Sequence, residues 1–405
     1  MRTKILLLPP LVLLLVAAPA GCGRTQDGPA GATDRTGELV IWADDKRTAA
    51  LTPFLDRFEQ ALGAKVRLHT VTGDGQASFV TAVQQGTGPD VTIGAHDWIG
   101  NLVRNGTIEP IRLTDAQRDA YTPAAVDAVT FDGRIYGVPY AVENLALIRN
   151  VDLAPTAPAT VEDLVTAGRR LVARGLAGEA LCLQVGQNGD GYHIFPLFNS
   201  GGGYLLGTDA DGDYDAGDIG VDEPGSIAAF TRIRALGEQG LGVLRRSIGP
   251  ENATNLFTRR QCPYLIAGPW AVPDVKAAGF PYAIDPIPGF RGGRPARPFL
   301  GVQAFYVAAG GDNRLLAQTF VTEFTADPDL AVALYEADPR PPALTAALVR
   351  VADGDPDAAR FLAAGEGGPP LPGLPAMPAI WETFGKAEAA IIGGADVAGT
   401  LRAAA

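Results

Sequence analysis

The sequence predicts an α/β protein with two lobes, each a mainly parallel sheet flanked by helices. Strand-like and helical segments alternate along most of the chain, which is typical of parallel sheets whose strands are connected by helices. The body that follows the N-terminal segment has about 370 residues, which is too long for one hydrophobic core. We therefore expect two lobes.

The N-terminal segment has the features of an export signal. Two cations precede an apolar run over 5–18, which is too short to span a membrane comfortably, and small residues lead to Cys22. The pattern resembles a bacterial lipoprotein signal at 1–21 with Cys22 as the lipidated residue, although Pro19 replaces the usual Leu. Residues 22–37 are predicted to be a flexible tether. We expect an exported lipoprotein at the cell membrane, facing the extracellular side or the periplasm.

The composition is acidic. Lys and Arg number 33 against 45 Asp and Glu, a formal net charge of −12, and removal of 1–21 would take away two cations and no acid, which gives −14. An acidic surface disfavours nucleic acid and anionic lipid as partners, because both repel it.

The first lobe is predicted to begin with three strands separated by helices. Asp44-Asp45-Lys46 follows the first strand, and His96-Asp97-Trp98 follows the third. Ligands of parallel sheets bind at the carboxyl ends of strands, so both clusters are candidate site residues. The elements expected here are strands at 38–43, 65–71 and 90–94 and helices at 51–62 and 79–85.

A hairpin and an interrupted strand follow. Asp132-Gly133 predicts a two-residue hairpin turn between β-rich flanks. Glu143 and Asn144 then interrupt an apolar strand, where β-branched or aromatic residues would be expected. Glu143 is therefore a candidate site residue. A solvated charge at a strand end is the commoner interpretation of this local pattern.

The rest of the chain continues the alternation. Residues 209–218 are rich in Asp, but Tyr214 and Gly220 stand where a calcium loop needs Gly and Glu, so we interpret this segment as a surface hairpin. Further elements are expected as helices at 161–173, 192–198, 224–238, 251–259, 313–326, 328–337, 342–351, 379–391 and 394–403 and strands at 181–185, 263–267 and 299–309.

Two cysteines remain in the body of the chain. Cys182 and Cys262 lie in strand-like segments of a chain predicted to be exported, and disulfides persist in such compartments. A disulfide between them and two buried free thiols are both compatible with the sequence.

Motifs of common catalytic and metal sites are absent from the sequence. The three histidines lack metal-ligand spacing, and none of the serines lies in a GxSxG elbow, so no cofactor is expected. What remains is carboxylates and aromatic residues on predicted loops. Carboxylates accept hydrogen bonds from sugar hydroxyls, worth about 1.5–3 kcal/mol each, and aromatic rings cover the apolar faces of pyranoses. This mixture of residues favours a neutral polyol as the ligand. For each tryptophan taken singly, a structural position in the hydrophobic core is the alternative interpretation.

Seven segments, taken together and in their order along the chain, form a recognisable set. They are LVIWADDK (39–46), GTGPDVTIGAHD (86–97), NGTIEPI (105–111), DAVTFDGRIYGVPYAVENLALIRN (127–150), GGYLLGTDADGDYDAGDIGVD (202–222), AGPWA (267–271) and PAMPAIW (375–381). This set resembles the extracellular solute-binding proteins of sugar ABC importers, specifically the maltose/maltodextrin-binding group, and the resemblance covers nearly the whole chain from Glu38. GPD and GPW are widespread among sugar-binding proteins, whereas AHD, the AVE run and the late tryptophan are more specific.

The resemblance implies four polar ligand-binding residues in the first part of the chain. Asp45 and Lys46 match the family's Asp-Lys pair that bonds glucose hydroxyls. Asp97 matches the aspartate of its AHDR segment, and Glu143 matches the glutamate beside the hinge. This match favours Glu143 as a site residue.

Four further residues match family positions in the second part of the chain. Asp190 and Tyr192 match a Glu-x-Tyr motif, with the acid one methylene shorter, and Trp270 and Trp381 match two aromatic residues that stack on sugar rings.

Three positions depart from the family pattern. Gly94 replaces a stacking tryptophan, Trp98 replaces the arginine after AHD, and Glu382 replaces a tyrosine next to Trp381. Trp98 and Glu382 are therefore also expected at the ligand, with Trp98 supplying the ring that Gly94 lacks. These departures leave the exact sugar, its length and its linkage open.

The resemblance also implies a periplasmic-binding-protein-like fold whose lobes close over the ligand about a hinge. The N-terminal lobe would comprise 38–143 and 302–352, and the C-terminal lobe 144–301 and 353–405. The hinge would be crossed near 142–146, 299–305 and 350–357.

The implied function is sugar import. A monomeric, lipid-anchored, non-enzymatic binding protein would deliver maltose or maltodextrins to the membrane subunits of an ABC importer. Three alternatives stay open: specificity for trehalose or another α-glucoside, an exported glycosidase that uses two of these carboxylates, and a sensory or adhesive sugar-binding module.

Overall fold

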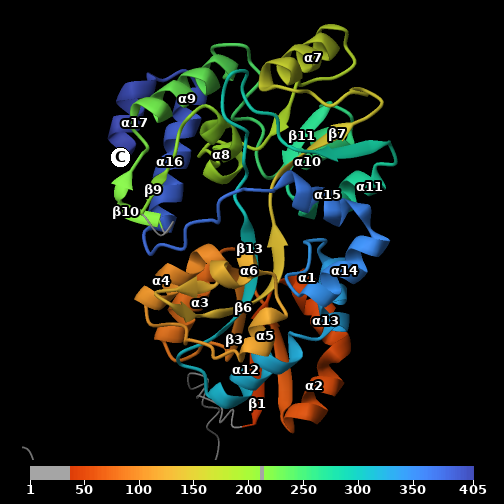
Figure 1. Ribbon diagram of the computed structural model, residues 1–405, viewed down its shortest axis with the longest axis vertical. Helices are drawn as coiled ribbons and strands as arrows, with labels where there is room; N and C mark the ends of the chain where they lie inside the picture. The colour runs from red at the N-terminus through yellow and green to blue at the C-terminus, as the bar shows by residue number, and fades with distance from the viewer. Residues whose placement is uncertain (1–36, 210–213) are drawn as a thin grey trace, which may run out of the picture. The chain divides into compact units, whose positions relative to one another are not determined.

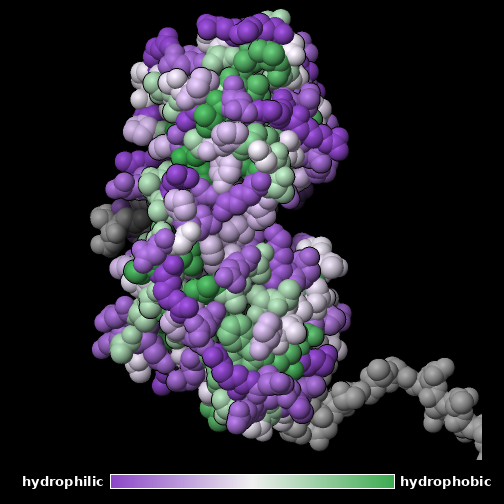
Figure 2. Space-filling model, turned by 90° about the vertical axis from the view of Figure 1, so that its right-hand side faces the viewer, coloured by the Kyte–Doolittle hydropathy of each residue, from purple (hydrophilic) through white to green (hydrophobic). Residues whose placement is uncertain are grey.

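A computed structural model of the chain describes residues 37–209 and 214–405. The predicted signal peptide, Cys22 and all but the last residue of the predicted tether lie outside the described residues. No helix within the described ranges combines the length and the apolarity that crossing a bilayer requires. Hydrophilic residues cover much of the face in Figure 2, and the hydrophobic residues on it form small separate patches.

The first sheet has five strands in the order β2-β1-β3-β13-β6 (Figure 1). The first three strands along the chain pair in parallel, as predicted, whereas β13 runs antiparallel to both of its neighbours. The strands are β1 (Glu38–Ala43), β2 (Lys65–Thr70), β3 (Val91–Ala95), β6 (Gly137–Glu143) and β13 (Gly301–Val307).

The second sheet has four strands in the order β12-β7-β11-β8. Only β11 and β8 pair in parallel. The α/β class with two sheets is confirmed, but the sheets are mixed rather than mainly parallel. The reason in the first sheet is that the chain leaves it through β6 and returns through β13, so these two strands run in opposite directions. The strands are β7 (Ala146–Asn150), β8 (Cys182–Leu183), β11 (Tyr264–Ala267) and β12 (Tyr282–Asp285).

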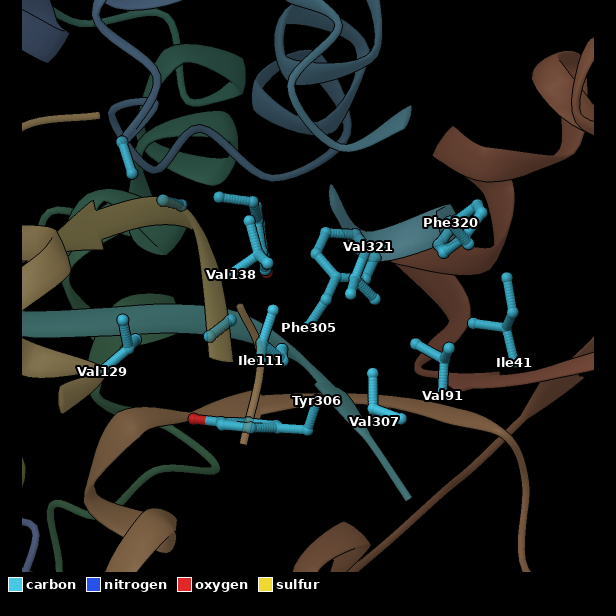
Figure 3. Packing of buried hydrophobic residues seen from close by; sticks show 14 of the residues in the cluster. Ile41, Val91, Ile111, Val129, Val138, Phe305, Tyr306, Val307, Phe320 and Val321 are labelled. Carbon is cyan, nitrogen blue, oxygen red and sulfur yellow. The ribbon is translucent and has the colours of Figure 1, made fainter. Parts of the chain in front are cut away.

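Each sheet has its own hydrophobic core. In the first core, β13 is buried along most of its length, and the ring of Phe305 meets Tyr140 and Phe320 edge-on at 5.3 Å and 6.1 Å (Figure 3). The second sheet is covered by two clusters of buried residues, and the largest includes Phe198, Phe230 and Phe384. Burial on both faces accounts for the near-continuous apolar runs of the strands.

Capping residues set several helix ends. Asp44 accepts a hydrogen bond from Arg47 N at 2.9 Å and begins α1, and Gly63 ends α2 in the left-handed conformation at φ 64°. The helices with eight or more residues are α2 (Leu55–Leu62), α3 (Gly75–Gln84), α7 (Val161–Ala173), α8 (Gly191–Ser200), α9 (Pro224–Leu236), α13 (Pro328–Ala337), α14 (Thr345–Gly354), α15 (Pro356–Ala364), α16 (Met377–Ile392) and α17 (Val397–Ala404). The shorter ones are α1 (Asp45–Leu51), α4 (Ile99–Arg104), α5 (Asp115–Asp119), α6 (Pro123–Ala128), α10 (Ala253–Thr258), α11 (Val272–Ala277), α12 (Arg314–Thr319), the 3₁₀ turns η1 (Thr52–Phe54), η2 (His96–Trp98) and η3 (Pro269–Ala271), and the π-helical η4 (Phe320–Phe324).

Two hairpins agree with the sequence. Asp132 and Gly133 have φ values of 47° and 69° between the antiparallel strands β4 (Thr130–Phe131) and β5 (Arg134–Ile135), as a turn of the predicted kind requires. Strands β9 (Leu206–Thr208) and β10 (Tyr214–Ile219) are also antiparallel, which confirms the hairpin interpretation on either side of 210–213.

The two cysteines form a disulfide. Cys182 in β8 is bonded to Cys262, just before β11, and their Cα atoms are 5.8 Å apart. Of the two alternatives left open by the sequence, the structure contains the disulfide. It links neighbouring strands of the second sheet across 80 positions of sequence.

Candidate functional site

Six side chains meet through direct contacts or through their charges, one at the end of β6 and the others in helices, turns or loops. We call them the central cluster: Asp97, Glu143, Tyr192, Trp270, Arg340 and Trp381. Five of them were predicted as ligand residues, and Arg340 was not. Ligand residues at the carboxyl ends of β3, β6 and β11 are what the sheet topology favours, because loops at strand ends converge there.

Asp97 and Trp381 join the two parts of the cluster. Asp97 lies in η2 directly after β3, and Trp381 lies in α16, with its Nε1 donating to Asp97 Oδ2 at 3.3 Å. Burial raises the pKa of Asp97 above its usual value, although His96 and the Trp381 hydrogen bond oppose the shift. A carboxylate and an indole side by side can together bond a hydroxyl and cover an apolar ring face.

His96 holds the end of β3 in place. Val302 N donates to its Nδ1 at 3.0 Å, and its Nε2 lies 3.1 Å from Leu371 O. A neutral ring with the proton on Nε2 satisfies both bonds. Burial lowers the pKa of His96, which favours this neutral form. His96 thus fixes the backbone next to Asp97 and has no need of a metal.

Glu143 is a buried residue. It is 8% exposed, its Oε1 accepts from Gln303 Nε2 at 3.1 Å, and its Oε2 contacts Arg340 Nε. The interpretation as a solvated charge is therefore wrong. A Cβ atom on Gly301 would lie 2.7 Å from Glu143 Cγ, so glycine at 301 leaves room for the carboxylate side chain.

Trp270 and Tyr192 supply rings from the second sheet. Trp270 lies in η3 after β11, and its ring centroid is 6.4 Å from that of Tyr192. The Tyr192 hydroxyl is buried and has no hydrogen-bond partner within the described residues. Burial raises the pKa of Tyr192 well above its usual value, and the nearby charge of Glu143 adds to this. A buried hydroxyl without a partner is costly, so it is a candidate for bonding a ligand.

Asp190 already has partners inside the protein. It caps α8 by accepting from His193 N at 3.0 Å, and it also accepts from Gln184 Nε2. Burial acts to raise the pKa of Asp190, but His193 and Gln184 outweigh it, so the pKa is lowered. Capping alone accounts for an aspartate at this position.

Asp45 and Lys46 lie in the first turn of α1, and both are exposed. Lys46 Nζ is 3.2 Å from Asp338 Oδ1. Burial, together with the charges of Arg340 and Arg47, lowers the pKa of Lys46. Lys46 connects to the central cluster through Asp338, which also contacts Arg340.

The three departures from the family pattern lie next to cluster residues in the sequence or contact their neighbours, as follows. A Cβ atom on Gly94 would be 2.1 Å from the ring of Trp98, so the indole occupies the space that a side chain at 94 would need. Glu382 is exposed on α16 and pairs with Lys386 at 2.5 Å, one helical turn later.

Four polar residues at the site were not predicted from the sequence: Arg47, Gln303, Asp338 and Arg340. The signal that could have identified the last two is a charged pair flanking Pro339, between two apolar helices and just before two further prolines. Arg47 lies in helix α1 and Gln303 in strand β13, and only the fold brings them to the site.

An apolar cavity next to the site is not formed by the cluster. It has a volume of about 440 Å³ and is lined by Phe195, Tyr214 and Phe299, among others. Phe299 contacts Trp381 edge-on at 5.9 Å, so the cavity adjoins the cluster. Because its lining is largely apolar, we identify the site from the polar and aromatic groups of the cluster. No group of three or more metal-ligating side chains occurs in the described ranges.

The fold and this arrangement of carboxylates and aromatic rings are those of a protein that binds a solute. The bacterial extracellular solute-binding protein family matches residues 54–359, and the chain belongs to it.

Several relatives are similar over most of their length. A galactooligosaccharide-binding protein of Bacillus subtilis is 28% identical over 386 residues, which cover 89% of this chain and 86% of the relative. A maltooligosaccharide ABC transporter solute-binding lipoprotein of Streptococcus pneumoniae is 28% identical over 389 residues, covering 91% and 87%. A maltodextrin-binding protein of Bacillus subtilis is 28% identical over 301 residues, covering 73% and 70%.

Proposed function

We propose that this chain is the substrate-binding protein of an ABC sugar importer and that it binds maltose or maltodextrins at the central cluster. The observation that carries the proposal is the bond from Trp381 Nε1 to Asp97 Oδ2, because it joins an aromatic ring on α16 and a carboxylate that directly follows β3. Asp45, Lys46, Trp98, Asp190 and Glu382 are proposed as further contacts, reached when the two lobes close over the sugar.

The chain's own groups favour a neutral sugar over an ion. Glu143 is paired with Arg340, and Lys46 and Arg47 are paired with Asp338, so these charges are already matched inside the protein and are not free for a charged ligand. Tyr192 offers a free hydroxyl, and Trp270 and Trp381 offer ring faces of the kind that pyranoses cover. Two relatives named above bind maltodextrin or maltooligosaccharide, by their names.

Galactooligosaccharides are a second candidate ligand. The relative named for them covers 89% of this chain, and their pyranose rings also suit aromatic platforms. The departures at 94, 98 and 382 are the positions at which a change of sugar would be expected.

Export, anchoring and partners complete the proposal. Lipidation of Cys22, with residues 22–37 as the tether, would hold a monomer near the membrane subunits of the importer. The lobe boundaries proposed are those given by the sequence, with 38–143 and 302–352 in one lobe. No catalytic role is proposed for the carboxylates.

Calorimetric titration tests the proposal. The soluble chain from Gly23 onward is titrated with maltose, maltotriose, trehalose and a galactooligosaccharide, and reducing ends are assayed after incubation. We expect binding to maltotriose in the micromolar range, about −8 kcal/mol, without release of reducing ends. Binding to the galactooligosaccharide alone would identify galactooligosaccharides as the ligand in place of maltodextrins. Release of reducing ends would show that the protein is a glycosidase.

A further inference from the structure

The segment 338–340, between α13 and α14, reaches the central cluster from a part of the chain that the sequence had not marked. Backbone pairing places it there. Val142 N donates to Pro341 O at 2.8 Å, and the residues that follow Arg340 run antiparallel to β6. Because β6 ends at Glu143, this pairing brings Arg340 beside that carboxylate.

Asp338 is surrounded by three cations. Its side chain is 3% exposed, and its carboxylate lies 3.2 Å from Lys46 Nζ and 2.7 Å from Arg47 Nη2, and also contacts Arg340. A buried carboxylate that is ion-paired with several cations holds them in one geometry, because the carboxylate would be costly to leave unpaired. The orientation of Lys46, a proposed sugar contact, therefore depends on Asp338.

Arg340 holds one group from each sheet. Its Nε contacts Glu143 of β6, and its guanidinium carbon is 5.2 Å from the ring centroid of Trp270, which follows β11. This distance is within the range of cation–π contacts. A planar guanidinium can bind two carboxylates and lie over an indole at once, whereas an ammonium is a point charge with no plane to stack.

We propose that Asp338 and Arg340 are positioning residues of the ligand site, which hold Lys46, Glu143 and Trp270 in the orientation that binds sugar. The proposal rests on the proposed function. In this role, the two residues affect sugar affinity through the side chains they hold, and neither needs to contact the sugar itself.

Three variants test the proposal by titration with maltotriose: Arg340→Ala, Arg340→Lys and Asp338→Asn. We expect Arg340→Ala and Asp338→Asn to bind at least tenfold more weakly than the wild type. Arg340→Lys should recover only part of the loss, because lysine keeps the positive charge but lacks the planar guanidinium group with its several N–H donors. The matched control is Arg350→Ala, which removes an exposed arginine paired with Asp329 at 2.9 Å and should leave affinity unchanged.

A second measurement separates positioning from general stability. The tryptophan fluorescence emission of ligand-free Arg340→Ala should differ from that of the wild type, because the substitution removes the cation from the indole ring of Trp270. When Trp270→Phe is also present, Arg340→Ala should no longer change the emission. Urea unfolding of each variant gives the folded fraction under titration conditions. If Arg340→Ala does not fold, Arg340→Lys replaces it in both measurements.

The outcomes are distinct. Folded Arg340→Ala with wild-type affinity and emission overturns the positioning role. A wild type that binds none of the four sugars refutes the proposed function instead.

Discussion

At the scale of single residues, the site combines groups that the protein fully satisfies with groups that it leaves open. Asp190 and His96 have internal hydrogen-bond partners, and both fix local backbone. Tyr192 has a buried hydroxyl without one. This contrast predicts which substitutions affect stability and which affect ligand binding.

Trp381→Ala should weaken sugar binding by about 1–3 kcal/mol, the scale of a buried aromatic contact. The fold should persist, because Trp381 is only partly buried at the edge of its core. Calorimetry with maltotriose measures the loss. Trp42→Ala is the control, since that ring packs on His69 and not on the cluster. Equal affinity of wild type and Trp381→Ala would remove Trp381 from the site.

Tyr192→Phe should weaken sugar binding by about 0.5–1.5 kcal/mol, the usual worth of one hydrogen bond, without lowering the free energy of unfolding. Stability is retained because, among residues 37–209 and 214–405, the hydroxyl makes no hydrogen bond that the substitution could remove. Titration and urea unfolding of the same preparation give both quantities. A clear loss of stability with unchanged affinity would mean that the hydroxyl serves the fold.

At the scale of secondary structure elements, the sequence predicted what local pattern and turn chemistry determine. The alternation through 38–94, the hairpin at Asp132-Gly133 and helix 161–173 were all predicted, because each depends on neighbouring residues. Strand β12 and helix α15 were missed. Strand β12 is short and only partly buried, so its apolar pattern is weak, and it is defined by its pairing with β7.

The candidate site was predictable where a residue type stood out against its element, as Glu143 does at the end of an apolar strand. It was not predictable for Arg340, whose position depends on the pairing of residues 341–343 with β6. Such pairing between distant segments leaves no local pattern in the sequence. The direction of β13 was missed for the same reason.

The junction made by His96 between β3, β13 and the segment at Leu371 predicts a pH effect. Because the folded pKa of His96 is lowered, the unfolded chain binds a proton that the folded chain does not. The contribution of His96 to the free energy of unfolding is therefore fully present above about pH 6.5. It is lost as the pH falls below that value, by up to about 1.4 kcal/mol for each pH unit.

Urea unfolding between pH 7.5 and 5.5 measures this slope. His96→Gln should show a shallower decline than the wild type, since its amide takes up no proton in either state. The exposed His69 provides the control, and His69→Gln should follow the wild type. Parallel curves for the wild type and His96→Gln would show that His96 does not govern the decline.

At the scale of the whole molecule, ligand binding and folding stability are linked. A sugar that binds only the folded protein stabilises it by about 2.7 kcal/mol at a concentration one hundred times its dissociation constant. Thermal unfolding with increasing maltotriose should therefore give a rising midpoint, and Trp381→Ala should need proportionally more sugar for the same rise. An equal rise with sucrose would identify a general solvent effect instead of site binding.

The contact between Gly94 and Trp98 restricts which residues this site accepts. The resemblance to the maltose/maltodextrin-binding group implies a stacking tryptophan at the position of Gly94, whereas in this chain the ring at that place belongs to Trp98, four residues further along. Any side chain at 94 would collide with that ring, since even a Cβ atom would lie 2.1 Å from it. Side chains at 94 and an indole at 98 are therefore incompatible in this packing, and a substitution at 94 would be accepted only together with a smaller residue at 98.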